Sequence, residues 1–219
     1  MKSKYFTLKE SVNDEFIVQK SRFIGYASPC QNEEEAKAFI AQIKSKHKDA
    51  THNCSAYIIG ENAEIMRYSD DGEPSGTAGI PMLEMLKQMQ LVNCVVVVTR
   101  YFGGILLGAG GLIRAYRKGA NIAVKASQVV CMESTFTCIV KIDYALWARL
   151  EKKLEILPLL LSHIEYSDCV RLELHIKQED LEATKQSILD FSEGKADISH
   201  GPAFYYPWPS ESEFNDEEL

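Results

Sequence analysis

The chain lacks the features that identify disulfide-rich, metal-cluster or membrane proteins. Its six cysteines lie far apart with no C-x-x-C pair, whereas a zinc or iron–sulfur site needs clustered thiolates. No segment approaches the ~18 apolar residues that cross a bilayer, and the first ten residues carry no apolar stretch typical of a secretory signal. We therefore expect buried free cysteines, no metal, no cofactor, no membrane partner and a cytoplasmic location.

The net charge of −7 is unevenly distributed along the 219 residues. Up to Val130 the chain has 16 Lys and Arg against 13 Asp and Glu, and from Cys131 it has 8 against 18, which accounts for all 24 basic and 31 acidic residues. The first part is therefore mildly basic, at +3, and the rest is acidic, at −10. The basic part leaves nucleic acid open as a partner, and the acidic part argues against it.

The first 130 residues read as one domain of alternating strands and helices. β-Branched and aromatic residues over Glu15–Pro29 predict strands, and the apolar periodicity after Glu33 predicts a helix with Asn32 as its N-cap. Further strands are predicted over His52–Ile59, Ile65–Ser69 and Val95–Thr99, and further helices from Pro81 and over Leu112–Ala126. This order is typical of an α/β or α+β sandwich.

From Thr135 the pattern starts again as strand, helix, two strands, helix and strand. The order β-α-β-β-α-β is that of a ferredoxin-like domain, which we place at residues 131–206. The last ten residues, SESEFNDEEL, are acidic, and we treat residues 207–219 as an acidic tail without a fold of its own. The predicted fold class is therefore α+β with two domains and a tail.

Two segments, Arg67–Pro81 and Val98–Tyr116, are too rich in glycine for ordinary connections. Glycine lets backbone N–H groups face outward, and in the second segment a strand runs through glycines into a helix whose N-terminus favours an anion. This pattern predicts an RNA- or anion-binding site composed of Arg67, Arg100, Tyr101, Phe102, Gly103, Gly104, Gly110, Gly111, Arg114 and Arg117. The alternative is a glycine-lined interior, where helix and strand backbones approach closely.

Acidic residues of the first segment have two interpretations. Asp70 and Asp71 precede a glycine as in a turn, and Glu73 would then form an ion pair with Arg67 or Arg100. The alternative is a loop site for a hard cation such as Mg²⁺. His52 and Cys54 lie two apart on a predicted strand, so they share a face; we favour a buried core cysteine over a thiolate–imidazole pair.

Both segments closely resemble the signature of the IMPACT/YigZ family. The resemblance is carried by the run Thr99-Arg-Tyr-Phe-Gly-Gly-x-x-Leu-Gly-Ala-Gly-Gly-Leu, and Lys20-Ser-Arg-Phe-Ile and His52-Asn-Cys-Ser-Ala-Tyr fit it as well. It implies an N-terminal domain folded like the second domain of a small-subunit ribosomal protein, followed by a ferredoxin-like domain. The pair is similar to domains IV and V of elongation factor G. The family is linked to translational control.

The sequence and the resemblance together predict a non-catalytic regulator of translation or of the stress response. It would bind RNA, the ribosome or a translation-associated protein through the glycine and arginine loops of its N-terminal domain. Two alternatives remain at this point. The same loops could hold a phosphate ligand or a nucleotide in an enzyme, or the protein could be an interaction adaptor without either activity. The sequence does not predict an oligomeric state.

Overall fold

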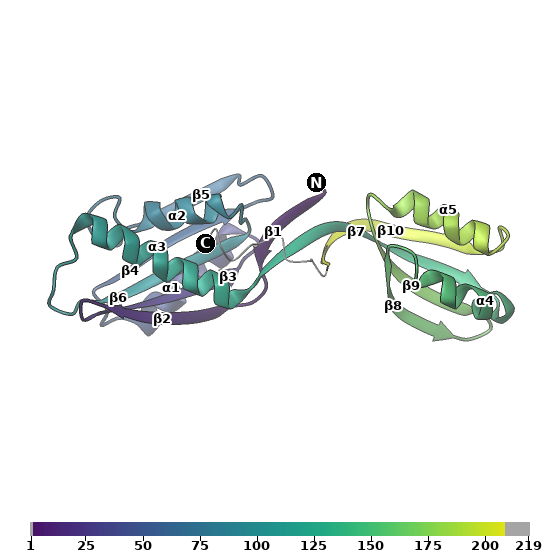
Figure 1. Ribbon diagram of the computed structural model, residues 1–219, viewed down its shortest axis with the longest axis horizontal. Coiled ribbons are helices and arrows are strands. Elements are labelled where there is room, and N and C mark those ends of the chain that lie inside the picture. The colour runs from purple at the N-terminus through teal and green to yellow at the C-terminus, as the bar shows by residue number, and fades with distance from the viewer. Residues whose placement is uncertain (1, 209–219) are drawn as a thin grey trace. The chain divides into compact units, whose positions relative to one another are not determined.

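A computed structural model describes residues 2–208 of the chain. They divide into two compact units of mixed α/β structure, residues 5–131 and residues 132–208 together with residues 2–4 (Figure 1). Residues 2–4, which the sequence analysis assigns to the N-terminal domain, belong to the second unit. There Ser134 N donates to Ser3 O at 2.8 Å, and the Tyr205 hydroxyl donates to Lys2 O at 2.9 Å.

The N-terminal unit is built on one antiparallel sheet with the strand order β2-β3-β6-β4-β5. Its strands are β2 (Val12–Val18), β3 (Ser21–Pro29), β4 (His52–Ile59), β5 (Ile65–Ser69) and β6 (Cys94–Tyr101). The central strand β6 is buried on both faces, as its run of valines predicts. The sequence does not predict β1 (Lys4–Leu8), which pairs with β7 and forms an isolated bridge from Phe6 to Leu91.

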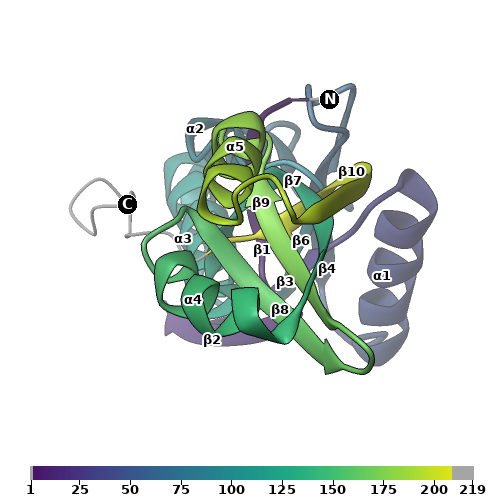
Figure 2. The same ribbon diagram turned by 90° about the vertical axis from the view of Figure 1, so that its right-hand side faces the viewer.

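Helices cover both faces of this sheet. α1 (Glu33–Lys46) lies on one face, whereas α2 (Gly79–Gln88) and α3 (Gly108–Ser127) lie on the other (Figure 2). Asn32 caps α1 as predicted, since its Oδ1 accepts a hydrogen bond from Glu35 N at 2.9 Å. α3 begins at Gly108 and not at Leu112, because the glycines before Leu112 already belong to its first turn.

Close backbone contact holds α3 against the sheet. A Cβ atom added to Gly25 on β3 would lie 1.9 Å from the carbonyl oxygen of Gly119 on α3. A Cβ atom at Gly119 would in turn lie 2.9 Å from Cγ1 of Val98. Only glycine leaves enough room at this helix–sheet contact, whose two glycines lie outside the two glycine-rich segments.

The C-terminal unit has the element order β-α-β-β-α-β. Its elements are β7 (Val129–Ile142), α4 (Tyr144–Leu154), β8 (Leu159–Tyr166), β9 (Val170–Lys177), α5 (Leu181–Phe191) and β10 (Asp197–Pro207). The strands are antiparallel in the order β10-β7-β9-β8. Alternate residues of β9, among them Leu172 and Leu174, are fully buried against Leu150 of α4 and Ile188 of α5.

β10 and the residue after it extend into the predicted acidic tail. Pro207 ends the strand, and Trp208 Nε1 donates to Thr135 Oγ1 at 2.8 Å, so the first two tail residues belong to this unit. The rest of that prediction, residues 209–219, lies outside the described residues. Among residues 2–208, no helix has the length and apolar character needed to cross a membrane.

Replacement of Gly25 by alanine tests the helix–sheet contact. Because the added Cβ would clash with the backbone of α3, we expect Gly25→Ala to cost at least about 3 kcal/mol of unfolding free energy, at the upper end of overpacking effects. The matched control is Gly110→Ala, whose Cβ would meet only the far end of Arg114 at 3.6 Å and should leave stability equal or higher. Urea unfolding followed by circular dichroism measures both; equal stabilities would contradict the contact.

Candidate functional site

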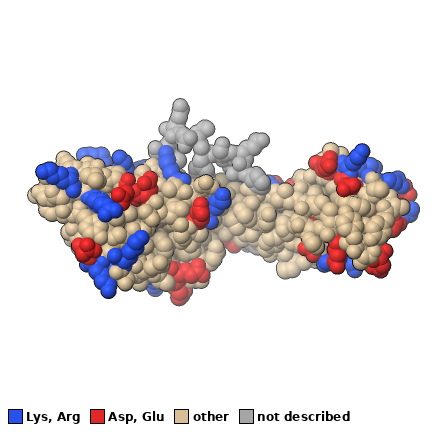
Figure 3. Space-filling view, turned by 90° about the horizontal axis from the view of Figure 1, so that it is seen from below, with Lys and Arg blue, Asp and Glu red and all other residues tan. Residues whose placement is uncertain are grey.

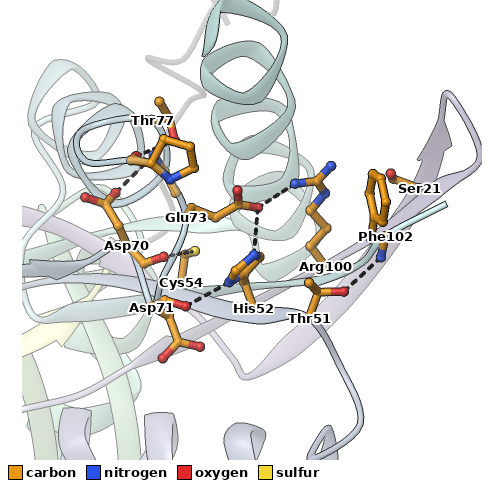
Figure 4. A network of polar contacts seen from close by, with 12 residues as sticks. Ser21, Thr51, His52, Cys54, Asp70, Asp71, Glu73, Thr77, Arg100 and Phe102 are labelled. Carbon is orange, nitrogen blue, oxygen red and sulfur yellow. Dashed lines mark hydrogen bonds and ion pairs between the residues drawn. The ribbon is translucent and has the colours of Figure 1, made fainter. Parts of the chain in front are cut away.

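A buried ion pair lies at the centre of the polar network in the N-terminal unit (Figure 4). Arg100 on β6 donates from Nη1 to Oε1 of Glu73 at 2.7 Å, and the Tyr116 hydroxyl of α3 donates to the same oxygen at 2.7 Å. The side chains of Arg100 and Glu73 are 6% and 3% exposed. The guanidinium also lies close to two rings, with its carbon 5.5 Å from the centroid of Phe23 and 5.4 Å from that of Phe102. The pair thus joins the sheet, the loop after β5 and α3.

His52 lies beside this pair, since it is the cross-strand partner of Arg100. Its Nδ1 donates to the carbonyl oxygen of Asp71 at 2.8 Å, and its Nε2 lies 3.8 Å from Oε1 of Glu73. A carbonyl can only accept, so Nδ1 is the donor in this hydrogen bond. Nε2 therefore faces the Glu73 carboxylate at the edge of the network.

The Asp70 carboxylate binds the backbone amides of the first glycine-rich segment. Its carboxylate accepts hydrogen bonds from Gly76 N at 2.9 Å, Ala78 N at 3.1 Å and Gly79 N at 2.7 Å, at the start of α2. An acid at this end also complements the helix dipole. The prediction that these amides face an external anion is wrong, because a carboxylate of the chain already binds them.

The three acids of this segment point to three different groups. Asp71 accepts from Lys44 Nζ at 2.5 Å and from Asn53 N at 2.7 Å, while Glu73 pairs with Arg100 and not with Arg67. The turn and ion-pair interpretation describes these contacts. Among residues 2–208 no three His, Cys, Asp or Glu side chains gather as a metal site would require, so the alternative of a Mg²⁺ loop has no support here.

The structure also bears on the thiolate–imidazole alternative for His52 and Cys54. Burial raises the pKa of the Cys54 thiol far above its usual range, and its Sγ donates to the carbonyl oxygen of Asp70 at 3.0 Å. Burial likewise raises the pKa of the Tyr116 hydroxyl, which stays protonated as a donor to Glu73. Cys54 is therefore a core thiol rather than a nucleophile.

Two residues of the predicted site lie on the opposite face of the sheet. Tyr101 follows Arg100 on β6 and so points to the α1 side, where its hydroxyl lies 2.8 Å from His47 Nδ1 and donates to Asp49 Oδ1 at 3.2 Å. Arg67, on the edge strand β5, is the cross-strand partner of Tyr57, which packs against α1. The prediction that both share one surface with Arg100 is wrong.

The glycines that follow have different structural roles. Gly103 N donates to Ser21 Oγ at 3.1 Å, and a Cβ at this position would lie 2.0 Å from the carbonyl carbon of Lys20, so its role is close packing. Gly104 has φ +85° and faces open space. Gly110 is exposed and Gly111 partly so, in the first turn of α3.

Arg114 and Arg117 are exposed on α3. Arg114 lies near Gly110, and Arg117 donates to the Gln88 side chain on α2. Of the predicted arginines, these two and Arg67 are exposed, while Arg100 is buried.

The loop between β6 and α3 has an apolar surface that the sequence analysis does not identify. Its large side chains are exposed: Phe102 by 45%, Ile105 by 41% and Leu106 by 84%, with Ile113 of α3 at 40%. Phe102 and Leu106 also line a cavity of ≈ 380 Å³ that reaches Arg100 and the first turn of α3. The available signal was the apolar triplet Ile105-Leu106-Leu107 between glycines, which no helical or strand period explains.

Substitution at Glu73 tests how far the network depends on the ion pair. Glu73→Gln leaves the Arg100 cation buried without its counter-ion, so we expect a loss of about 3–5 kcal/mol in unfolding free energy. The double variant Glu73→Gln with Arg100→Gln removes both charges and should recover most of that loss. Native-state hydrogen exchange of the β6 amides reports on this unit alone. A Glu73→Gln variant with unchanged β6 protection would contradict the role given to the pair.

His47 makes the stability of this unit depend on pH. Burial lowers the pKa of His47, whose ring nitrogens lie 2.6 Å and 2.8 Å from the hydroxyls of Tyr26 and Tyr101. The unfolded chain therefore binds a proton here more readily than the folded chain. The contribution to stability is complete above the unfolded pKa of about 6.5 and is lost as the pH falls through the lower folded value. We expect His47→Gln to flatten the fall in melting temperature from about pH 7 to pH 5; a slope equal to the wild type would exclude this role.

Comparison with known proteins finds a matching family model for each of the two units. Residues 19–124 match the Impact N-terminal domain, and residues 140–195 match a domain of unknown function, DUF1949. The chain is 45% identical over 201 residues to the IMPACT family member YvyE of Bacillus subtilis, covering 92% of this chain and 93% of that protein. It is 36% identical to an IMPACT family member of Haemophilus influenzae over 88% of this chain and 95% of that one.

A solved structure gives the same result for the fold. A crystal structure described as that of "an hypothetical protein" superimposes with a TM-score of 0.59 at 30% identity, over 90% of this chain and 97% of that one. The similarity to relatives therefore extends across both units and is not confined to the glycine-rich segments. The chain belongs to the IMPACT family.

Proposed function

We propose that this protein is a non-catalytic regulator of translation that binds a protein partner through the loop before α3. The contact surface, which we name the apolar loop surface, consists of the exposed side chains of Phe102, Ile105, Leu106 and Ile113. The observation that carries the proposal is Leu106, a leucine that is 84% exposed in the loop between β6 and α3. Neighbouring exposed apolar side chains of this kind are typical of an interaction surface.

A protein partner fits this surface better than RNA does. RNA affinity depends on Lys and Arg placed against phosphates, whereas the arginines of this unit are dispersed over two sheet faces and α3. Basic and acidic side chains are also interspersed on the face of the unit shown in Figure 3. Leucine and isoleucine have no ring to stack on a base, but they suit the apolar core of a protein interface, with Arg114 at the rim.

A binding role agrees with the state of the reactive groups. The Cys54 thiol is protonated and bonded, and the carboxylates of Asp70, Asp71 and Glu73 are occupied by amides or cations of the same chain. Catalysis by such groups would first require these contacts to break. The enzymatic alternative therefore has less support than a binding surface.

The link to translation rests on the family resemblance, and the topology supports the fold that it implies. The order β-α-β-β-α-β with the sheet β10-β7-β9-β8 supports a ferredoxin-like C-terminal domain. The five-stranded sheet with helices on both faces supports an N-terminal domain like domain IV of elongation factor G. A regulator of translation with this architecture would act in the cytoplasm.

Leu106→Asp tests the proposal in a purified bacterial translation system. We expect the wild-type protein to change the yield of a reporter, and Leu106→Asp to be at least about tenfold less potent, because burial of a leucine is worth about 1.5–3 kcal/mol. Ile17→Asp is the matched control, since Ile17 is 70% exposed on β2 and lies in register with Arg22 and Tyr101, on the α1 face of the sheet. Both variants should melt like the wild type.

Two results would overturn the proposal. If the wild-type protein leaves the yield unchanged, the role in translation fails; if Leu106→Asp and Ile17→Asp are equally potent, the surface fails. An RNA partner would instead appear as binding with a slope of log K against log salt of about −1.4 to −2.7, as expected for two or three phosphate contacts. Such a slope together with an unchanged Leu106→Asp variant would replace the protein partner by RNA.

A further inference from the structure

We propose that the cavity beneath the apolar loop surface binds a small organic carboxylate that carries a neighbouring hydroxyl group and a short apolar body. The cavity has a volume of ≈ 380 Å³, within the range of about 300–1,000 Å³ that is usual for small-molecule sites. Its wall combines a few polar groups, Arg100, His52 and Glu73, with the apolar side chains of Phe102 and Leu106. Neither the family assignment nor the proposed function assigns a ligand to it.

Arg100 gives this cavity an incompletely used cation. The residue is only 5% exposed, and within residues 2–208 its guanidinium donates one hydrogen bond, from Nη1 to Glu73. Its Nε is buried and has no hydrogen-bond partner among the described residues. A guanidinium has five N–H donors, and a buried donor without an acceptor is unfavourable. The second terminal nitrogen, Nη2, also has no hydrogen bond within residues 2–208, and an oxyanion in the cavity that Arg100 lines would give the guanidinium a further acceptor.

The first turn of α3 adds backbone donors to the same wall. Gly108 and Ala109 line the cavity, and no side chain within residues 2–208 caps this helix. The N–H groups of a first turn have no acceptor inside the helix, and the helix dipole adds partial positive charge. In α2 of the same unit, the corresponding position is occupied by the Asp70 carboxylate. A carboxylate is thus the group that this unit already uses at a comparable helix end.

His52 and Glu73 determine which group of the ligand can lie next to the ligand's carboxylate. The Glu73 carboxylate is an acceptor, and His52 Nε2 lies 3.8 Å from its Oε1. A second oxyanion next to them would be repelled, whereas a hydroxyl group could donate a hydrogen bond. Apolar groups of the ligand would fill the rest of the cavity, against Phe102, Leu106 and Leu112. A small 2-hydroxy acid with an aliphatic side chain has all three features.

This proposal does not rest on the proposed function. The binding groups lie on β4, β6 and α3 inside the N-terminal unit, so the cavity can bind its ligand whether or not the apolar loop surface has a partner. The two ideas meet at Leu106, which is exposed on the loop and lines the cavity.

Titration with 2-hydroxy-4-methylpentanoate, followed by ¹H–¹⁵N NMR of the full chain, tests the site. We expect saturable shifts of the Ala109 and Gly110 amides and of Arg100 Nε at millimolar concentrations. The neutral amide of the same acid should shift these signals at least about tenfold more weakly, because it lacks the charge that strengthens the hydrogen bonds. Inorganic phosphate should bind less well, since it cannot fill the apolar wall. Equal binding of acid and amide, or no shift with the acid, would overturn the proposal.

A matched pair of variants measures how much the N-terminus of α3 contributes to ligand binding, apart from the rest of the cavity. Ala109→Pro removes one N–H in the first turn, where proline is tolerated, and should weaken binding at least about tenfold. Ala109→Gly keeps that N–H and should bind like the wild type. A folded Ala109→Pro variant with unchanged affinity would exclude the helix end from the site.

Leu107→Asp is a second test that does not depend on the proline variant folding. Leu107 is the N-cap of α3 and has no capping hydrogen bond, so an aspartate there would itself bind the free amides. We expect this variant to lose binding of the acid while its melting temperature stays equal or rises. Retained binding in a stably folded Leu107→Asp variant would overturn the proposal.

Discussion

The buried contact between Arg100 and Glu73 determines the arrangement of the N-terminal unit around its loops. With Tyr116 it joins a central strand, the loop after β5 and α3 through a single carboxylate oxygen. Two charges away from water require close geometry, because their desolvation is offset only by direct contact and hydrogen bonding. The loop after β5 therefore cannot leave the sheet without exposing an unpaired charge. The position of Phe102 beside the guanidinium, and with it the wall of the cavity, follows from this pair.

Local patterns predicted most of the secondary structure. The strands His52–Ile59 and Ile65–Ser69 have the bounds that the sequence indicates, and Asn32 caps α1, because both depend on residues next to each other in the chain. The C-terminal order of strands and helices could be predicted for the same reason. β1 could not be, because it pairs with residues more than a hundred positions away. The helical start of α3 at Gly108 was also missed, since glycine is a poor helix former.

The candidate site was harder to predict, because its partners come together only in the folded sheet. Glu73 and Arg100 are 27 residues apart, and the sequence does not say whether Arg67 or Arg100 is the partner. Nor does it show that Asp70 binds the amides after it, since glycine allows them to face inward as well as outward. The sequence predicts a strand that ends at Thr99, whereas β6 runs on to Tyr101, so Arg100 and Tyr101 point to opposite faces of the sheet.

The grouping of residues 2–4 with the C-terminal unit has a consequence for synthesis of the chain. Ser3 and Lys2 can form these contacts only after Ser134 and Tyr205 have been translated. Residues 2–4 thus precede residues 5–131 in the sequence but contact residues that follow them. The entropic cost of closing so long a loop is only slightly larger than that of closing a shorter one, because the cost grows with the logarithm of loop length. A label attached at Lys2 would consequently report on the C-terminal unit.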